Sequence, residues 1–308
     1  MNNNQDYRYQ LDSRKVTGRR QQKTTCPQCG GKKCFVRYVD TQNGYQYLHD
    51  NVGRCDHEQR CGYHYKPSEF FHDNPWRTDE IPERKNPSGP KQQTPPPLIP
   101  IDTAYVERSH SPKSTFWQWF ITDCAQKAGF TLEDAERVYH DYSIGATKNG
   151  DVIFWQIDHE QRVRSGHIMH YNQQGHREGY QGWIHTRLIE KKLLPPDFTL
   201  YQCFFGEHLL IRRPEATVCL VESEKTALIL AAVQPNHIWL ATCGSSGLSA
   251  VKCTCLQGRR VVLFPDSGCL GKWQQRMSET SGIDYSFCQD MEHYPPNTDL
   301  ADLLLGNG

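Results

Sequence analysis

The sequence predicts a multidomain chain of mixed α+β and α/β class: a small β module, a proline-rich linker, an α+β middle region and a parallel-sheet α/β domain. Paired cysteines and short β-type runs occupy residues 25–72. Prolines crowd residues 73–100, where apolar residues are few. After residue 215, apolar strand-like runs alternate with helical segments, a pattern typical of a parallel sheet covered by helices.

Composition sets the boundaries between five segments. We expect a flexible basic arm at 1–24, the β module at 25–72, a semi-rigid linker at 73–100, the middle region at 101–214 and the α/β domain at 215–308. No internal repeat is found.

The middle region and the last domain each have their own pattern. An amphipathic helix is predicted over 113–129, a second helix begins at Thr131 as N-cap, and strands at 151–158 and 162–171 form a hairpin. Strands then follow at 217–221, 238–242 and 260–264. Helices are predicted from Glu224, from Ser246 and over 271–279.

Charge and cysteine content narrow the class of protein. The formal net charge is zero, but residues 1–70 hold 12 Lys/Arg against 7 Asp/Glu, a net charge of +5. A basic head on an acidic body suits a phosphate-binding module beside a carboxylate metal site. No apolar run approaches the roughly 20 residues that span a membrane, and thirteen cysteines behind a polar N-terminus indicate a reducing compartment, so a cytoplasmic protein is expected.

Two cysteine pairs predict a structural zinc site. Cys26 and Cys29 are followed, after 25 residues, by Cys55 and Cys61. Two thiolate pairs around a hairpin-sized insert suit tetrahedral zinc, and so small a module needs a metal to hold it. The second pair has the wider spacing, so Cys61 is the least secure ligand. Competing ligands are Cys34, His57 and His64.

This cysteine segment resembles the N-terminal zinc ribbon of bacterial replicative primases. A Cys-Pro-x-Cys knuckle, the strand Phe35-Val-Arg-Tyr, a second pair before Gly62 and the terminal Phe70-Phe71 occur in the family's order. The resemblance implies a ribbon that scans single-stranded template. Arg37 is the candidate backbone contact, and nearby tyrosines suit base stacking or, more often, completion of a small core.

Two carboxylates follow apolar strands in the last domain. Glu222 ends one strand, and Asp266 ends the next but one, in the run Val261-Val-Leu-Phe-Pro-Asp. Carboxylates at the C-terminal ends of adjacent parallel strands lie where open α/β sheets bind ligands, and their oxygens suit Mg²⁺ or Mn²⁺. Asp299 and Asp302 add two later carboxylates.

The order of these motifs resembles the Toprim domain shared by primases, topoisomerases and recombination-mediator proteins. By that resemblance, Glu222 and Asp266 are catalytic metal ligands, Gly271 is the motif glycine, and Asp299 and Asp302 are the late acidic pair. Gly268 stands where the family has a second aspartate. One ligand is therefore missing, so Glu224 or Asp302 substitutes, the site holds one weak metal, or catalysis is lost.

The middle region extends the resemblance to the primase core. Tyr142-Ser-Ile-Gly145 and the hairpin that follows resemble the segment before the Toprim domain in primases, and the whole chain resembles Toprim-bearing proteins of mobile genetic elements. Candidate nucleic-acid contacts are basic side chains of this region and of the next helix. They are Arg162, Arg164, His167, Arg187 and Lys225.

Three functions remain open. The first is a primase-type nucleotidyltransferase that joins ribonucleoside triphosphates on single-stranded DNA in replication or transfer of a mobile element. The second is a non-catalytic DNA- or RNA-binding accessory with a degenerate Toprim domain, and the third is a Toprim nuclease. No G-x-x-x-x-G-K-S/T motif occurs, so unwinding would need a separate helicase.

Overall fold

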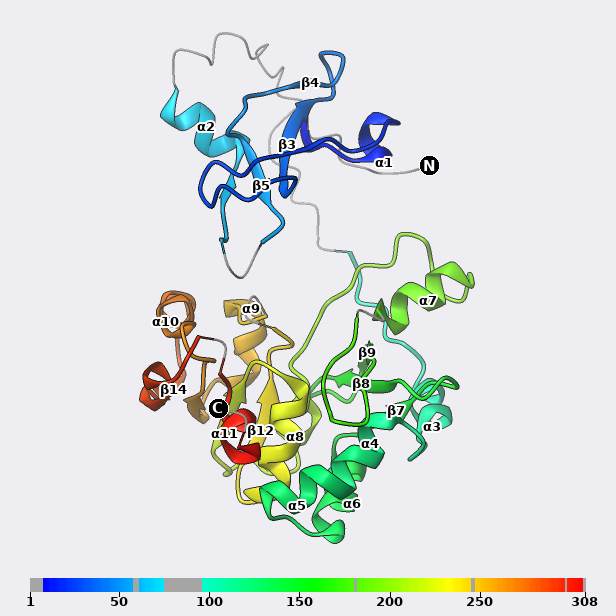
Figure 1. Cartoon of the computed structure of the whole chain (residues 1–308). Helices are drawn as coiled ribbons and strands as arrows, with labels where there is room; N and C mark the ends of the chain where they lie inside the picture. Colours follow the sequence, from blue (N-terminus) through cyan, green and yellow to red (C-terminus); the bar gives the residue numbers. More distant parts are fainter. Residues whose placement is uncertain are drawn as a thin grey trace. The chain divides into compact units, whose positions relative to one another are not determined.

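The chain forms two compact units, Met1–Gln93 and Thr94–Gly308, whose elements Figure 1 shows. The computed structural model describes residues 8–57, 61–74, 96–179, 182–244, 247–296 and 298–306. The boundary between the units falls within the predicted linker of residues 73–100. Most of that linker, residues 75–95, lies outside the described residues.

The first unit is an antiparallel sheet built around the strand β3 (Phe35–Asp40). This strand pairs with four others, and β5 in turn pairs with β6. The strands are β1 (Tyr9–Leu11), β2 (Lys23–Thr24), β4 (Gln46–Tyr47), β5 (Gly53–Cys55) and β6 (His64–Tyr65). Two helices complete the unit, α1 (Arg14–Thr17) and α2 (Pro67–Asp73). Its small buried core holds Cys26, Cys34, Phe35 and Cys55.

The prediction that residues 1–24 form a flexible arm is wrong for the part that the structure describes. The first strand, β1, pairs antiparallel with β3, and β2 pairs with the start of β3. The segment is also fixed by side chains. Arg8 donates two hydrogen bonds to Asp40 Oδ2, at 2.9 and 2.7 Å, and buried Asp12 accepts from the Tyr47 hydroxyl at 2.8 Å. These strands have only three and two residues, which is too few to show a strand pattern within a polar, basic segment. Residues 1–7 lie outside the described residues.

The second unit begins with a helical part and an antiparallel sheet of order β10-β9-β8-β7. The strands are β7 (Gly145–Ala146), β8 (Val152–Ile157), β9 (Val163–Met169) and β10 (Gly182–Trp183). The predicted hairpin is confirmed as β8 and β9. The helices are α3 (Ala104–Ser109), α4 (Thr115–Trp119), the π-helical turn η2 (Phe120–Cys124), α5 (Ala125–Ala128), α6 (Leu132–Asp141) and α7 (Ile184–Glu190).

Both predicted helices of this part are confirmed. The first runs through α4, η2 and α5 and ends at Gly129, whose φ of 77° is the left-handed C-cap that glycine adopts freely. The second begins at Thr131. Its hydroxyl accepts from the Asp134 N–H at 3.2 Å while the Asp134 carboxylate accepts from the Thr131 N–H at 3.0 Å, a reciprocal capping box.

The second sheet of this unit is parallel throughout, in the order β12-β11-β13-β14. Its strands are β11 (Val218–Val221), β12 (Ile238–Ala241), β13 (Arg260–Leu263) and β14 (Asp284–Phe287). The accompanying helices are α8 (Glu224–Val233), α9 (Ala250–Cys253), α10 (Leu270–Met277) and α11 (Leu300–Leu305), with short 3₁₀ turns η3 (Glu207–Leu209), η4 (Thr254–Leu256) and η5 (Asp290–His293). No helix among these described segments is both long and apolar enough to cross a membrane.

Three of the four parallel strands were predicted, and β14 was not. Its side chains are mostly exposed, so it lacks the apolar run that marks β11 to β13. The helix expected from Ser246 begins later, at Ala250, where the Ser249 hydroxyl caps the Lys252 N–H at 3.4 Å. Residue 246 itself lies outside the described residues.

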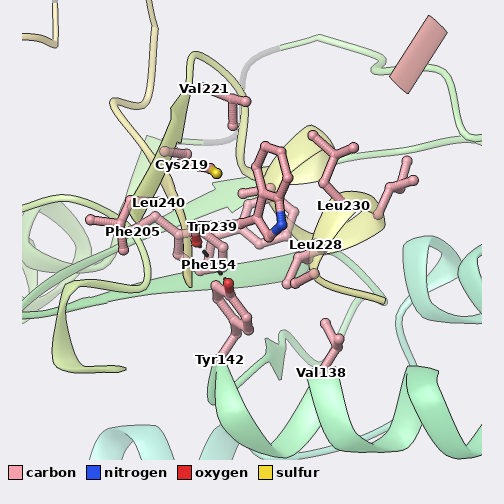
Figure 2. Packing of buried hydrophobic residues seen from close by; sticks show 14 of the residues in the cluster. Val138, Tyr142, Phe154, Phe205, Cys219, Val221, Leu228, Leu230, Trp239 and Leu240 are labelled. Carbon is pink, nitrogen blue, oxygen red and sulfur yellow. Dashed lines mark hydrogen bonds between the residues drawn. The ribbon is translucent and has the colours of Figure 1, made fainter. Parts of the chain in front are cut away.

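One hydrophobic core joins the middle region to the parallel sheet across the expected boundary at residues 214 and 215. It contains Phe154 and Phe205 from the first part and Trp239 and Leu240 from the second (Figure 2). The aromatic rings of Phe154 and Phe205 meet edge to face, with 5.6 Å between centroids. Burial of this shared surface, at roughly 25 cal/mol per Å², binds the two regions into one folding unit.

Candidate functional site

Four cysteines of the ribbon meet at two tight turns. In the first turn the Gly30 N–H donates to the Cys26 carbonyl oxygen at 3.0 Å, and Gly30 has a φ of 68°. In the second, the N–H groups of Cys61 and Gly62 donate to the His57 carbonyl oxygen at 2.8 and 3.1 Å. These turns bring the Sγ atoms of Cys26 and Cys61 within 3.7 Å of each other, and those of Cys29 and Cys55 within 3.9 Å.

These distances fit tetrahedral zinc. A Zn–S bond of about 2.3 Å places the sulfur atoms of a tetrahedral site about 3.8 Å apart. The Sγ atoms of Cys26, Cys29, Cys55 and Cys61 all lie within 4.8 Å of one another. Cys61, whose wide spacing made it the least secure ligand, is therefore part of the cluster. Zinc bound here would hold a domain whose apolar core is otherwise small.

Two of the competing ligands lie beside this cluster. Cys34 Sγ is 3.8 Å from Cys55 Sγ, and His57 Nδ1 is 3.8 Å from Cys29 Sγ. The hydrogen bond with His57 lowers the pKa of Cys29 to about 6, which favours the thiolate form that binds metal. His64 is engaged elsewhere, with Nε2 at 2.9 Å from the Tyr38 hydroxyl.

The two predicted acids lie after neighbouring strands. Glu222 directly follows β11, and Asp266 follows β13, which pairs with β11 in parallel. Glu222 is 94% buried, and its Oε1 is enclosed without a hydrogen-bond partner among the described residues. Burial raises the pKa of Glu222. Burial, followed by the charges of Glu222, Asp299 and Asp302, raises the pKa of Asp266 to about 8.

This arrangement fits a divalent cation. Two carboxylates that repel each other in a partly dry setting are stabilised when a cation lies between them or when one takes up a proton. The orphaned Glu222 oxygen is an unused ligand atom. Mg²⁺ commonly takes one or two protein carboxylates and keeps several waters, and Glu222 and Asp266 are the two residues that would hold it here.

Asp299 and Asp302 lie near Asp266 and also perform a structural task. Asp299 caps α11, accepting from the Asp302 N–H at 2.8 Å, and also accepts from the Thr226 hydroxyl at 2.6 Å. Burial, then the charge of Asp299, raises the pKa of Asp302, while Lys225 opposes that shift. Among the described residues, no three carboxylates bring ligand oxygens within 4.8 Å of one another.

Gly268, which stands where the Toprim family has a second aspartate, offers only its backbone to the site. Gly268 has a φ of 84°, a conformation that is strained for residues other than glycine, and its N–H donates to Glu292 Oε1 at 3.1 Å. Glu224, which the sequence suggested as a substitute ligand, is fully buried and accepts from His167 Nδ1 at 2.7 Å. Its carboxylate is thus already partnered.

Three of the predicted nucleic-acid contacts are paired with carboxylates. Arg162 Nε and Arg164 Nε donate to Asp158 Oδ2 at 2.8 and 2.6 Å. Arg37 donates to Asp50 Oδ1 at 2.6 Å and lies over the Tyr47 ring, 3.7 Å from its centroid. The three guanidinium groups are therefore already engaged by carboxylates of this chain.

The other predicted contacts have different surroundings. Arg187 lies in the last turn of α7 and is half-buried. Lys225 follows Glu224 in the first turn of α8, close enough to Asp302 to oppose the rise in that carboxyl group's pKa. His167 stacks on Trp183, with 4.4 Å between ring centroids, and donates to Glu224. Lys225 is therefore the predicted basic residue associated with the acidic site.

Sequence reasoning missed the partners of these residues. Asp158 looked like a turn residue, and the available signal was its position four and six residues before Arg162 and Arg164. Glu222 and Glu224 are both buried, and no signal in the sequence distinguishes the Glu222 oxygen that has no described partner from the Glu224 carboxylate that His167 engages. Glu292 gave no signal because it comes from a separate 3₁₀ turn.

Together, the cysteine-bearing β-ribbon and the parallel-sheet unit define the chain as a zinc-ribbon protein with an α/β second unit. A family model of the zinc beta-ribbon finger (Zn_ribbon_16) matches residues 7–76. The model of the family named domain of unknown function (DUF6371) matches residues 114–267, half of the sequence, and the chain belongs to that family. No curated protein matches the sequence.

Several solved structures of primases are similar to this chain. The DnaG catalytic core is 16% identical, with 67% of this chain and 74% of that chain covered and a TM-score of 0.43. The primase fragment of the bacteriophage T7 primase-helicase protein is 13% identical, with 93% of this chain and 95% of that chain covered and a TM-score of 0.37. The zinc-binding and RNA polymerase domains of the Aquifex aeolicus primase are 11% identical, with 96% of this chain and 77% of that chain covered and a TM-score of 0.41.

Proposed function

We propose that the chain is a primase-like protein that joins ribonucleoside triphosphates on a single-stranded DNA template. The observation that carries this proposal is the pair of carboxylates that follow two adjacent parallel strands, Glu222 after β11 and Asp266 after β13. Glu222 is buried, and one of its oxygens has no hydrogen-bond partner among the described residues. The same two acids support the proposal that the parallel sheet belongs to a Toprim-type domain.

The chain's own residues would prepare the site for nucleotides. Glu222 and Asp266 would hold Mg²⁺ or Mn²⁺, which supplies charge neutralisation at the transferring phosphate. Asp299 and Asp302 would add negative potential that strengthens cation binding, because both raise the pKa of Asp266. Lys225, whose charge acts on Asp302, would bind phosphate oxygens and limit the net negative charge of the site.

The zinc ribbon would bind the template. Its positive net charge suits a phosphate backbone, and its exposed basic residues Arg19, Arg20, Lys32 and Lys33 suit a single strand without base specificity. Tyr63, one of the tyrosines near Arg37, packs on Phe35 with 5.7 Å between ring centroids. It therefore contributes to the core of the ribbon. A separate helicase would supply unwinding, and the reducing cytoplasm of a cell carrying a mobile element would suit the thiols.

A non-catalytic DNA- or RNA-binding accessory is the second candidate. It is favoured by Gly268, which offers a backbone N–H to Glu292 where the Toprim family has an aspartate, and by the lack of a third carboxylate close enough to share a metal among the described residues. A nuclease would use the same two acids and an activated water.

Primer synthesis on single-stranded DNA separates these functions. Full-length protein would be incubated with the template, labelled ribonucleoside triphosphates and millimolar Mg²⁺ or Mn²⁺. The proposal predicts labelled oligonucleotides that disappear with Glu222→Gln or Asp266→Asn and persist with Glu279→Gln, a change of an exposed acid in the same unit. Template cleavage without synthesis would indicate a nuclease. Binding without either product would indicate the accessory.

A further inference from the structure

The ribbon contains a second set of four metal-ligating side chains that overlaps the first. Cys29, Cys34, Cys55 and His57 have ligand atoms that all lie within 4.8 Å of one another. Cys29 and Cys55 belong to both sets, so six side chains form one cluster. Cys34 and His57 are the additional members, and a site of four cysteines alone leaves both without a metal.

The two sets have one pair of ligand atoms in common, as two coordination tetrahedra that share an edge would. The shared edge joins the Sγ atoms of Cys29 and Cys55, which are 3.9 Å apart. Beyond one side of it lie Cys26 and Cys61, 3.7 Å apart. Each of these values is close to the edge of about 3.8 Å expected for tetrahedral zinc–thiolate coordination.

The two additional ligand atoms lie at similar distances from the shared pair. Cys34 Sγ lies 3.8 Å from Cys55 Sγ, and His57 Nδ1 lies 3.8 Å from Cys29 Sγ. Each additional ligand therefore lies close to one of the two shared thiolates. We propose that the ribbon binds two zinc ions. The Cys29 and Cys55 thiolates would bridge them, and Cys34 and His57 would complete the coordination sphere of the second ion.

Charge balance supports a second ion. Four thiolates around one zinc leave a net charge of −2, whereas five thiolates and a neutral imidazole around two zinc ions leave −1. Cys34 and Cys55 are 96% and 99% buried, and unbalanced charge is costly in such surroundings. Sharing two thiolates between two cations thus lowers the cost of keeping buried sulfur ionised.

Gly31 shows how closely the backbone approaches the second set. A Cβ atom at Gly31 would lie 2.9 Å from Cys34 Sγ, 3.0 Å from His57 Cε1 and 3.4 Å from Cys29 Sγ. Three of the four ligands in the second set therefore converge on this one position, and no side chain fits among them. The Cys34 thiol donates to the Gly31 carbonyl oxygen at 3.0 Å, and a zinc ion bound by Cys34 would replace that proton.

Zinc content of the full-length protein tests the proposal, independently of any catalytic role. After anaerobic zinc loading and removal of excess metal, elemental analysis should give two zinc ions per chain. Cys34→Ala and His57→Ala should each retain one ion, because Cys26, Cys29, Cys55 and Cys61 remain. Cys29→Ala should lose both, since its thiolate is shared. Cys124→Ala, a buried cysteine of the other unit, is the matched control and should retain two.

Cadmium-113 NMR provides a second readout that does not depend on counting. The cadmium-loaded wild-type protein should show two resonances, and Cys34→Ala should show one. A wild-type content of one zinc or less would overturn the proposal. So would two ions that persist in both Cys34→Ala and His57→Ala, since the second site would then use other ligands.

Discussion

The Tyr142 hydroxyl donates a hydrogen bond to the Trp239 carbonyl oxygen at 2.7 Å, in the core shown in Figure 2. Tyr142 ends α6 of the middle region, and Trp239 lies within β12 of the parallel sheet. Both residues are almost fully buried. This contact fixes the middle region to the sheet whose strand ends carry the candidate acids.

Tyr142→Phe should destabilise the second unit. Removing the hydroxyl leaves the buried carbonyl oxygen of Trp239 without this donor, which costs roughly 1–3 kcal/mol. In a unit of this size the melting temperature should fall by about 2–4 °C for each kcal/mol. Tyr285→Phe, at an exposed tyrosine, should leave it unchanged. Equal melting curves for Tyr142→Phe and the wild type would show that the contact contributes nothing.

Asp158 should give the unit a specific acid sensitivity. Burial alone would raise its pKa, but hydrogen bonds from Arg162 and Arg164 outweigh burial and hold the pKa below its ordinary value. A carboxyl group with a depressed folded-state pKa contributes stability above its unfolded-state pKa, near 3.9, and loses it as pH falls through the folded-state pKa.

Asp158→Asn should therefore cost roughly 3 kcal/mol at pH 7, because it leaves two arginines without their buried partner. The difference from the wild type should shrink as pH falls from 5 toward 3. Chemical denaturation at several pH values measures it. A difference that stays constant over this range would mean that the ion pairs do not stabilise the fold.

Nucleic-acid binding should depend on Arg187 more than on Arg162. Arg162 is held by Asp158, whereas Arg187 lies on α7 with no ion pair among the described contacts. Fluorescence anisotropy with single-stranded DNA at several salt concentrations should show weaker binding and a shallower salt dependence for Arg187→Ala, by about one phosphate contact. Arg162→Ala should have the smaller effect. The reverse order would exclude α7 from the interface.

Chelation of zinc should unfold the ribbon and leave the second unit intact. The ribbon buries only a few apolar side chains besides its cysteines, among them Phe35, Val39 and Val52, which is too little to hold a domain without metal. Hydrogen exchange should show residues 8–74 losing protection in EDTA while β11 and β12 keep theirs. Continued protection of β3 without metal would show that packing alone holds the ribbon.

Local signals in the sequence predicted much of this structure. The Thr131 cap, the β8–β9 hairpin, three parallel strands and four clustered cysteines each follow from residues close together in the chain. The position of Glu222 and Asp266 after neighbouring strands followed from the alternation of strands and helices. These features are local, or they repeat a simple pattern.

The remaining features depend on contacts between distant residues. The strand β1 has only three residues, and Arg8, directly before it, is fixed by Asp40, 32 residues later in the sequence. The pairing of Glu224 with His167 joins positions 57 residues apart, so the different roles of Glu222 and Glu224 were not visible in the sequence.

Metal-dependent melting tests the central claim, that Glu222 and Asp266 form a divalent-cation site. A cation at 100 times its dissociation constant should stabilise the unit by roughly 2.7 kcal/mol, which raises the melting temperature by about 5–10 °C. Asp266→Asn should abolish this rise. It should not lower the melting temperature of the metal-free protein, because it removes repulsion from Glu222. A wild-type melting curve that does not move in millimolar Mg²⁺ or Mn²⁺ would contradict the account.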